Sequence, residues 1–315
     1  MISLKAVDRV EILSVMDNSI DVLMASTPLA RRLKRDRDAL SKPQLRAEHG
    51  VSMLVTTYEE DKKDSFLFDT GVTIDGVLHN MDVLEIKGNE LHAVVLSHGH
   101  TDHTRGLMGF IKRYGRPRVS IVLHPDAYLK RKNVQPDGHE SEHIPPSRRD
   151  LEAEDVEIIE EREPTMVIGG RALVTGQISR TTPFEKGSPA QVAWIDGKWQ
   201  PDPWIHDDQA IVLNVKNRGL VVLTGCGHAG VVNTLKCARE LTGVNQVHAV
   251  IGGFHLTGPT FEPIISPTIQ ALKEFNPSVI VPQHCTGWKA THLIAREFPT
   301  AFIPNSVGTT MVIGA

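Results

Sequence analysis

Residues 98–103 of this 315-residue chain read His-Gly-His-Thr-Asp-His, which places three imidazoles and one carboxylate within six positions. The apolar run Ala93-Val94-Val95-Leu96 comes just before them and predicts a strand. The strand fixes the start of the stretch, and the turn that Gly99 permits lets alternate side chains converge beyond its end. Imidazole and carboxylate bind zinc, iron or manganese, and the stretch offers more donor atoms than one four-coordinate ion needs. The stretch therefore predicts a site for two metal ions at the end of a strand.

Histidines also follow three later apolar runs. These runs are Val221-Val222-Leu223 before His228, Ala249-Val250-Ile251 before His255, and Val279-Ile280-Val281 before His284. If the runs are strands, the imidazoles collect along one edge of a sheet, where loops bend while the strands hold their positions. The competing interpretation is that one or two of these three residues are unrelated loop histidines.

Short β-branched runs bounded by Gly, Pro and Asp alternate with helical patterns, which indicates the α/β class. Strands are predicted at residues 9–15, 52–57, 65–68, 93–96, 119–123, 210–215, 220–224, 249–251, 279–281 and 309–313, and helices at 102–114, 230–242 and 263–275. The charged stretches near 24–48 and 132–163 are interpreted as excursions from the core. Residues 1–315 are therefore expected to form a single domain.

Composition limits the partners that the chain can have. The net charge is −4 with both signs interspersed, so no nucleic acid is expected as a partner. No apolar stretch is long enough to cross a bilayer, and the N-terminus lacks the pattern of a signal peptide. The three cysteines, Cys226, Cys237 and Cys285, are too few for a disulfide framework. We expect a cytoplasmic protein that acts on a small molecule, and its oligomeric state stays open.

The stretch from Ser97 to His103 resembles the HxHxDH signature of the metallo-β-lactamase superfamily. Further stretches resemble the branch of that superfamily labelled 7,8-dihydropterin-6-yl-methyl-4-(β-D-ribofuranosyl)aminobenzene 5'-phosphate synthase. They are Glu48-His49-Gly50, Phe68-Asp69-Thr70-Gly71, Thr224-Gly225-Cys226-Gly227-His228, Gly252-Gly253-Phe254-His255-Leu256 and His284-Cys285-Thr286-Gly287. The resemblance implies an αββα sandwich with two mixed sheets flanked by helices. It also implies two divalent ions, zinc in first place and iron or manganese as alternatives.

The resemblance assigns the metal ligands residue by residue. His98 and His100 hold the first metal, and Asp102, His103 and His284 hold the second. The third ligand of the first metal is open between His228 and His206, and we prefer His228 because it lies in the ordered turn that the branch pattern contains. Cys226 stands where many members of the superfamily have a bridging Asp. It bridges, ligates or merely packs as a small buried residue.

Other residues are assigned by resemblance to the surroundings of the metals. Asp69 resembles a carboxylate that orients a ligand, and it also suits a cap of the following turn. With Asp102 it is the candidate for a catalytic carboxylate. His255 is interpreted as a substrate contact or a hydrogen-bond donor to a ligand, and His49 either reaches the cleft or is structural. Arg180 is a candidate pocket residue, as is Glu185.

The chain departs from the branch pattern at Arg105, where glycine is usual, and at Thr101, where an aromatic residue is frequent. Because the cation of Arg105 lies one turn from the predicted metals, the substrate of the branch is not assigned to this chain. The basic run Arg31-Arg32-Leu33-Lys34-Arg35 is typical of a solvated helix face, and our hypothesis is a lid that receives a phosphate. Asp207-Asp208 either orients a ligand or caps a hairpin, and the sequence does not decide between these roles.

Two divalent ions lower the pKa of a shared water toward neutrality, which makes a hydroxide nucleophile, and they polarise the substrate oxygen. We therefore expect a binuclear metal-dependent hydrolase of a small, phosphorylated, ester-like substrate. The first alternative is a pterin transferase that joins a dihydropterin to an aminobenzene ribotide phosphate. The others are an iron-loaded redox site, although no flavin signature is seen, and a non-enzymatic metal-dependent ligand sensor. An RNA nuclease ranks lower because the chain lacks a basic track.

Overall fold

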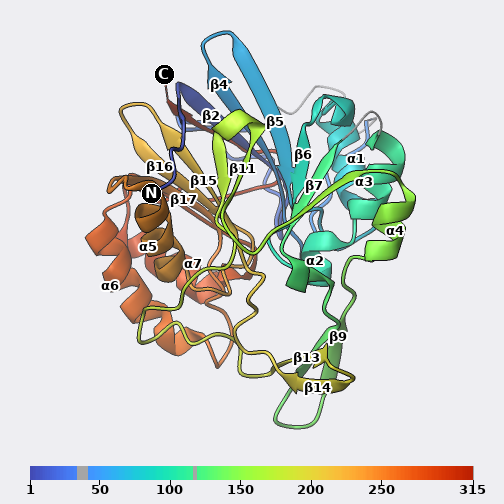
Figure 1. Ribbon diagram of the computed structural model, residues 1–315. Helices are drawn as coiled ribbons and strands as arrows, with labels where there is room; N and C mark the ends of the chain where they lie inside the picture. Colours follow the sequence, from blue (N-terminus) through green and yellow to red (C-terminus); the bar gives the residue numbers. More distant parts are fainter. Residues whose placement is uncertain (34–41, 116–118, 315) are drawn as a thin grey trace.

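Two β-sheets pack face to face at the centre of the molecule, because their strands carry apolar side chains on the faces that meet (Figure 1). This computed structural model describes residues 1–33, 42–115 and 119–314. Lys34 and Arg35 of the predicted phosphate lid lie outside the described residues. Helices cover the outer face of each sheet. The predicted αββα sandwich, with two mixed sheets flanked by helices, is therefore confirmed.

The first sheet has eight strands, of which four neighbours are parallel and the rest antiparallel. Its strands in spatial order are β10 (Glu157–Glu160), β7 (Ser120–Leu123), β6 (Ala93–Val95), β5 (Lys62–Phe68), β4 (Ser52–Glu59), β2 (Arg9–Met16), β19 (Thr310–Gly314) and β3 (Ala30–Arg31). Two of these strands lie in the stretches that were predicted to be excursions. β3 pairs with β19, and β10 pairs with β7. That prediction was wrong for these segments, because short strands with one exposed face lack a long apolar run.

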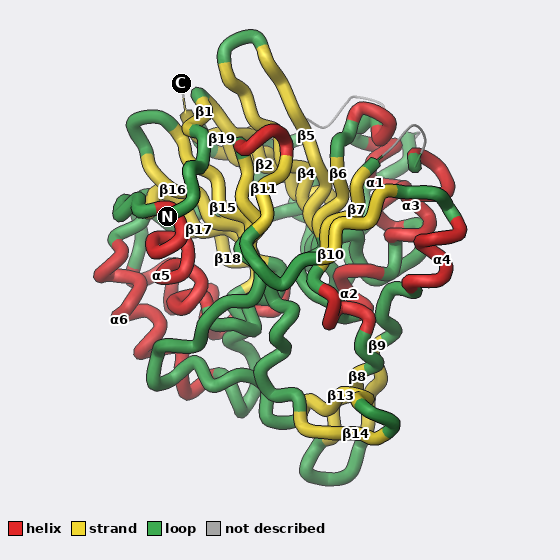
Figure 2. The backbone as a smooth tube through the Cα atoms, viewed as in Figure 1, coloured by secondary structure: helices red, strands yellow, loops and turns green. Residues whose placement is uncertain are grey.

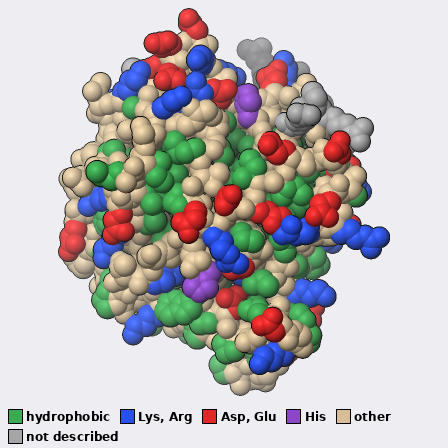
Figure 3. Space-filling view, in the orientation of Figure 1, with side chains coloured by type: hydrophobic (Ala, Val, Ile, Leu, Met, Phe, Trp, Pro, Cys, Tyr) green, Lys and Arg blue, Asp and Glu red, His purple; other side chains and the backbone are tan. Residues whose placement is uncertain are grey.

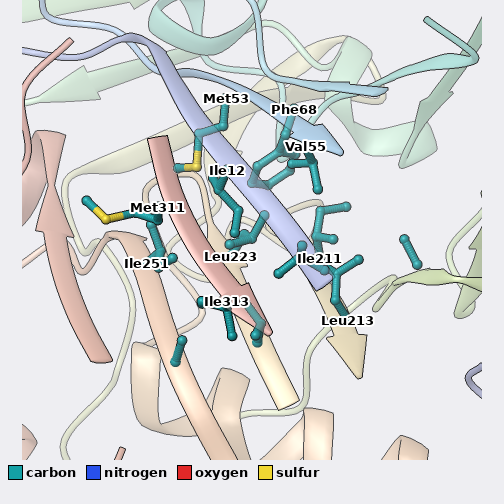
Figure 4. Close-up of a cluster of buried hydrophobic side chains, with 14 of the residues drawn as sticks. Ile12, Met53, Val55, Phe68, Ile211, Leu213, Leu223, Ile251, Met311 and Ile313 are labelled. Atoms are coloured by element: carbon teal, nitrogen blue, oxygen red, sulfur yellow. The ribbon is translucent and has the colours of Figure 1, made fainter. Parts of the chain in front are cut away.

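The second sheet is also mixed, with β16, β17 and β18 parallel to one another. Its strands in spatial order are β11 (Thr165–Val167), β12 (Ala172–Val174), β15 (Ala210–Val215), β16 (Gly219–Thr224), β17 (Val247–Gly253) and β18 (Val279–Gln283), and β1 (Ala6–Val7) also pairs with β15. Side chains of both sheets interlock between them. Figure 4 shows Ile12 and Val55 of the first sheet facing the same core as Ile211 and Leu223 of the second.

Helices complete the sandwich. They are α1 (Gly76–Val83), α2 (Thr101–Thr104), α3 (Leu107–Tyr114), α4 (Arg148–Ala153), α5 (Val231–Thr242), α6 (Ile265–Phe275) and α7 (Trp288–Glu297). Apolar side chains of α5, α6 and α7 pack on the second sheet, and those of α1 and α3 pack on the first. The helix predicted at residues 102–114 is broken near Gly106, where an added Cβ would lie 2.3 Å from the carbonyl oxygen of Thr70. Because Gly106 has no side chain, its backbone can approach that of Thr70 closely.

A third sheet of four strands lies outside the sandwich, at the lower end of Figure 1, and loops connect it to the sandwich (Figure 2). Its strands in order are β14 (Lys198–Pro201), β13 (Gln191–Ile195), β8 (Arg131–Val134) and β9 (Glu140–His143). The buried guanidinium of Arg131 fastens this sheet to the loop before β15. Its Nε donates to Asp202 at 2.7 Å, and its Nη1 donates to Asp207 at 3.0 Å. Residues 132–143, within the stretch near 132–163 that was predicted to be an excursion, thus lie outside the sandwich in an ordered sheet.

The surface carries charges of both signs. On the face seen in Figure 3, acidic and basic side chains are interspersed without a broad patch of either sign. Within the described ranges, no helix has the length and apolar character needed to span a bilayer.

The strand ends explain where a site can form. β5 and β6 run parallel in the first sheet, and β16, β17 and β18 run parallel in the second. Asp69 follows β5, and residues 98–103 follow β6, whereas His228, His255 and His284 follow strands of the other sheet. The histidines therefore gather at strand ends, as predicted, but the prediction of one sheet edge was wrong. Two sheets contribute, because each provides parallel strands that end at the same side of the sandwich.

Candidate metal centre

The loop after β6 is held by carboxylates on both sides. Ser97 donates from its backbone N–H to Oδ1 of Asp69 at 2.7 Å and from its hydroxyl to Oδ2, also at 2.7 Å. The N–H of Gly99 donates to Oδ2 of Asp207 at 2.8 Å. A Cβ on Gly99 would lie 2.0 Å from the carbonyl oxygen of Ala127, so this position requires glycine for space. The loop is thereby fixed before any metal is considered.

His98, His100 and His228 form the first group of donors. One ligand atom from each lies within 4.8 Å of the others, and all three side chains are buried. Nε2 of His98, Nε2 of His100 and both ring nitrogens of His228 have no hydrogen-bond partner among the described residues. Buried nitrogens without partners are costly unless a bound group satisfies them. Three such imidazoles fit a divalent cation of the zinc type.

Asp102, His103, Cys226 and His284 form the second group, with ligand atoms again within 4.8 Å of one another. Nε2 of His103 lies 3.1 Å from Sγ of Cys226, and Nε2 of His284 lies 3.1 Å from Oδ2 of Asp102. This donor set combines a carboxylate, two imidazoles and a thiol. Zinc accepts all three kinds of ligand, and iron accepts them as well. The second group therefore also fits a divalent cation.

Cys226 lies between the two groups. Its ligand atom belongs to the second group and also lies within 4.8 Å of ligand atoms on His228 and His255. The three cysteines are free, and those at 226 and 285 are buried. Burial raises the pKa of the Cys226 thiol in the absence of a metal. A metal would favour the thiolate instead.

Burial and neighbouring imidazoles hold the pKa values of His98, His100 and His228 well below the ordinary value. These three rings are therefore neutral near pH 7, which is the form that binds metals. Burial also acts to lower the pKa of His103. The carboxylates of Asp102 and Asp69 outweigh it and raise this pKa to about 9. Without a bound cation, the ring of His103 is therefore expected to be protonated near pH 7.

Further polar groups orient His103 and His284 through hydrogen bonds to their Nδ1 or backbone N–H groups. Nδ1 of His103 lies 2.7 Å from Oδ2 of Asp69, a residue whose backbone φ is 63°. Such a left-handed backbone at a non-glycine residue is strained and must be held by its surroundings. The backbone N–H of His284 donates to Asp17 at 2.9 Å, and its Nδ1 lies 3.2 Å from Oδ1 of Asn18. These contacts fix which ring nitrogen faces the other ligands.

The acidic pair after His206 has two separate roles. Asp207 accepts from Gly99 and pairs with Arg131, whereas Asp208 accepts from the N–H of Ala229 at 2.7 Å. Oδ1 of Asp208 lies 4.0 Å from Nδ1 of His98. Asp207 therefore positions the loop at residues 97–103, and Asp208 positions the turn that carries His228.

The remaining candidates lie at different distances from the centre. The ring of His255 is 4.2 Å from that of His228, and the ring of the exposed His49 lies 4.5 Å from that of His284 with the planes tilted by 31°. Arg180 donates to the carbonyl groups of Ile178, Trp204 and Ile205, so it supports a loop. Glu185 accepts from the N–H groups of Val232 and Asn233 at the start of α5. Among the groups of potential ligands in the described chain, none contains His206.

His143 was missed by the sequence analysis. Its ring stacks on that of His100, with centroids 3.9 Å apart and planes at 10°. It lies on a polar strand in the predicted excursion, so no apolar run precedes it. Asp17 and Asn18 were missed as well, although they follow the apolar end of β2 just as Asp69 follows β5. That shared position was the signal for them.

A cavity of about 400 Å³ opens beside His228 and His255. Apolar and aromatic side chains form much of its wall, including Phe184, Phe254 and Phe261, and Lys186 is at its edge. Arg180 is not among its lining residues, whereas Glu185 is. The cavity has the size and lining of a small-molecule site next to the first group of donors.

The chain is similar in sequence to known proteins. The model of the metallo-β-lactamase superfamily matches residues 45–241. The chain is 30% identical over 259 residues to the 7,8-dihydropterin-6-methyl-4-(β-D-ribofuranosyl)-aminobenzene-5'-phosphate synthase of Methanocaldococcus jannaschii, and the match covers 81% of this chain and 87% of that protein. An uncharacterized protein of the same organism is 29% identical over 248 residues, covering 78% and 86%.

Solved structures agree with these matches. Tm1679, described as a metal-dependent hydrolase of the β-lactamase superfamily, superposes with a TM-score of 0.73 at 25% identity, covering 97% of this chain and 100% of that chain. The metallo-β-lactamase fold protein YhfI of Bacillus subtilis has a TM-score of 0.51 at 13% identity, with the same coverage of 97% and 100%. The second likeness concerns the fold alone.

Proposed function

Because the chain belongs to the metallo-β-lactamase superfamily, we propose that it is a binuclear metal-dependent hydrolase of a small ester-like substrate. The observation that carries the proposal is the pair of adjoining donor groups, with the thiol of Cys226 between them. Structural metal sites are usually single and fully enclosed. Two neighbouring groups beside a cavity of substrate size favour catalysis instead.

In this proposal, His98, His100 and His228 would hold the first metal, and Asp102, His103 and His284 would hold the second. Cys226 is a further candidate donor beside both groups. We propose zinc, because a thiol and imidazoles together suit it, with iron or manganese as alternatives. When bound, the two ions supply a nucleophile from water at neutral pH and polarise the substrate's reacting oxygen.

The chain's own residues prepare this site. Asp69 accepts the Nδ1 proton of His103, which leaves the lone pair of Nε2 for a metal. Oδ1 of Asn18 contacts Nδ1 of His284 in a similar manner, and Asp17 accepts the backbone N–H of that residue. Burial keeps the rings of His98, His100 and His228 neutral and excludes bulk water from the donors. The aromatic cavity receives the organic part of the substrate.

We place phosphorylated esters first among the substrates. The synthase from M. jannaschii carries a 5'-phosphate in the name of its product. In this chain, the half-buried Arg105 lies one turn after Asp102, and its guanidinium makes no ion pair or hydrogen bond with any described residue. A cation without a partner one turn from Asp102 favours an anionic substrate. Free thiols at the centre favour a reducing compartment, so we propose a cytoplasmic location.

The test combines metal content with a screen of carboxylic esters, phosphomonoesters and phosphodiesters on the same preparation. We expect about two metal ions per chain and hydrolysis that is lost in His98→Ala. His206→Ala is the matched control. His206 directly precedes Asp207, which holds Gly99, but it lies outside both donor groups. Hydrolysis that persists after complete removal of the metals would overturn the proposal.

A second function is favoured by the 30% identity to the synthase from M. jannaschii. A pterin transferase would join a dihydropterin to an aminobenzene ribotide phosphate at the same metals. Mass spectrometry distinguishes the two functions, because only a transferase forms a product that contains both moieties. That product, together with no hydrolysis of any ester, would replace the hydrolase by the transferase.

A further inference from the structure

His143 reaches the metal centre from outside the sandwich. It is the last residue of β9 in the four-stranded sheet. The next residue, Ile144, donates its N–H to the hydroxyl of Thr101 at 2.6 Å, within the metal-binding stretch. Arg131 on the neighbouring strand pairs with Asp207, which also accepts from Gly99. The small sheet is thereby attached to the metal-binding loop at two points, so the position of His143 is fixed relative to that loop.

The ring of His143 lies beside the donors that remain accessible. One of its nitrogens lies within 4.8 Å of ligand atoms on His100 and Asp102. The side chain of Asp102 keeps 17% of its surface exposed, whereas those of His103 and His284 keep 0%. His143 is itself half-buried. A substrate can therefore approach the second metal from the side on which Asp102 and His143 lie.

The hydrogen bonds of His143 indicate what it offers to a substrate. Nδ2 of Asn133 donates to Nε2 of His143 at 3.1 Å. That bond uses the lone pair of Nε2, so the neutral ring carries its proton on Nδ1. Nδ1 makes no hydrogen bond to any residue in the described parts of the chain. An N–H group in this state is a donor and not a metal ligand, which requires a free lone pair.

We propose that His143 is a substrate-contacting residue, whose Nδ1–H donates a hydrogen bond to an anionic oxygen of the substrate at the metal centre. The inference rests on the proposed function, in which that substrate is an ester or phosphate ester. Stacking on His100 holds the ring plane, and Asn133 sets the tautomer. The four-stranded sheet thus supplies a recognition group to a centre that the sandwich builds.

Two substitutions separate the hydrogen bond from the stacking. His143→Phe keeps an aromatic ring against His100 but removes the donor, whereas His143→Asn places an amide N–H near the former Nδ1 but removes the ring. His139→Phe, on an exposed turn of the same hairpin, is the matched control. The affinity of the zinc-loaded proteins for inorganic phosphate is measured by calorimetry, with metal content and melting temperature on the same samples.

We expect His143→Phe to bind phosphate about 10- to 100-fold more weakly, the effect of one hydrogen bond to a charged group. His143→Asn should recover part of that loss, and all variants should keep the metal content of the wild type. Equal phosphate affinity of the wild type and His143→Phe would overturn the inference, as would a loss of metal in both variants. The phosphate measurement needs no turnover, so its result is separate from failure of the hydrolase proposal.

Discussion

Nδ1 of His103 lies 2.7 Å from Oδ2 of Asp69, and the same carboxylate oxygen accepts the hydroxyl proton of Ser97 at 2.7 Å. One buried side chain thus holds both the loop after β6 and a ring of the second donor group. Asp69 follows β5, the strand beside β6, so two neighbouring strands of one sheet fix this geometry together. Several consequences for metal binding and stability can be measured.

Asp69→Asn should weaken binding of the second metal. The amide cannot accept hydrogen bonds at both of its polar atoms. The ring of His103 is therefore held less firmly, and its basicity falls. Loss of such an orienting carboxylate typically lowers metal affinity by about 10- to 100-fold. Competition with a chromophoric zinc chelator measures the change. Asp61→Asn, on an exposed turn at the far end of β5, should leave the affinity unaltered.

His228→Ala and His206→Ala form a matched pair that tests the third ligand of the first metal. A ring nitrogen of His228 lies within 4.8 Å of ligand atoms on His98 and His100. Among the described residues, His206 belongs to no such group. The first substitution should remove about one metal ion per chain, and the second should remove none. The reverse pattern would return the assignment to His206.

Gly99→Ala should destabilise the fold and disturb metal binding together. The added Cβ would lie 2.0 Å from a backbone oxygen of Ala127, which cannot move away as a flexible side chain can. Overpacking of this kind costs about 1–3 kcal/mol or more of unfolding free energy. Urea denaturation with and without zinc measures it. A variant as stable as the wild type would show that the loop at 97–103 is less constrained than the structure indicates.

Arg131→Met should destabilise the protein strongly. The guanidinium is 1% exposed and binds two carboxylates, Asp202 and Asp207, which the variant would leave without a countercharge. Removing one partner of a buried ion pair costs about 3–5 kcal/mol. The free energy of unfolding should fall by that amount, and metal affinity should fall too because Asp207 holds Gly99. A loss below about 1 kcal/mol would contradict this role.

Much of the sandwich could be predicted because its central strands are continuous apolar runs. The run at 93–96 matches β6, and the run at 279–281 matches most of β18. The small sheet was not predicted, because β8, β9 and β14 are largely polar and only β13 is an apolar run. Its strands are held by Arg131 and by pairing with one another. The helices α1 and α7 were also missed. The apolar positions of α1 make no clear helical period, whereas those of α7 do, so α7 could have been predicted from its sequence.

The residues at the centre of the site are close together in the sequence, whereas those that surround them come from distant parts of the chain. His98, His100, Asp102 and His103 lie within six residues, so their spacing alone predicts that they meet. His143 stacks on His100 from 43 positions away, and Asp17 contacts His284 across 267 positions. Such contacts depend on how the sheets and the inserted strands pack, which no local pattern encodes. The assignment of these residues therefore required the structure.

The most direct test of the account is the metal content of wild-type protein purified without added metal, measured per chain by mass spectrometry beside His98→Ala and His284→Ala. The account predicts about two ions per wild-type chain and a loss in each variant, because the two residues belong to different donor groups. A wild-type chain that retains no metal and takes up less than one equivalent of zinc would contradict the binuclear centre.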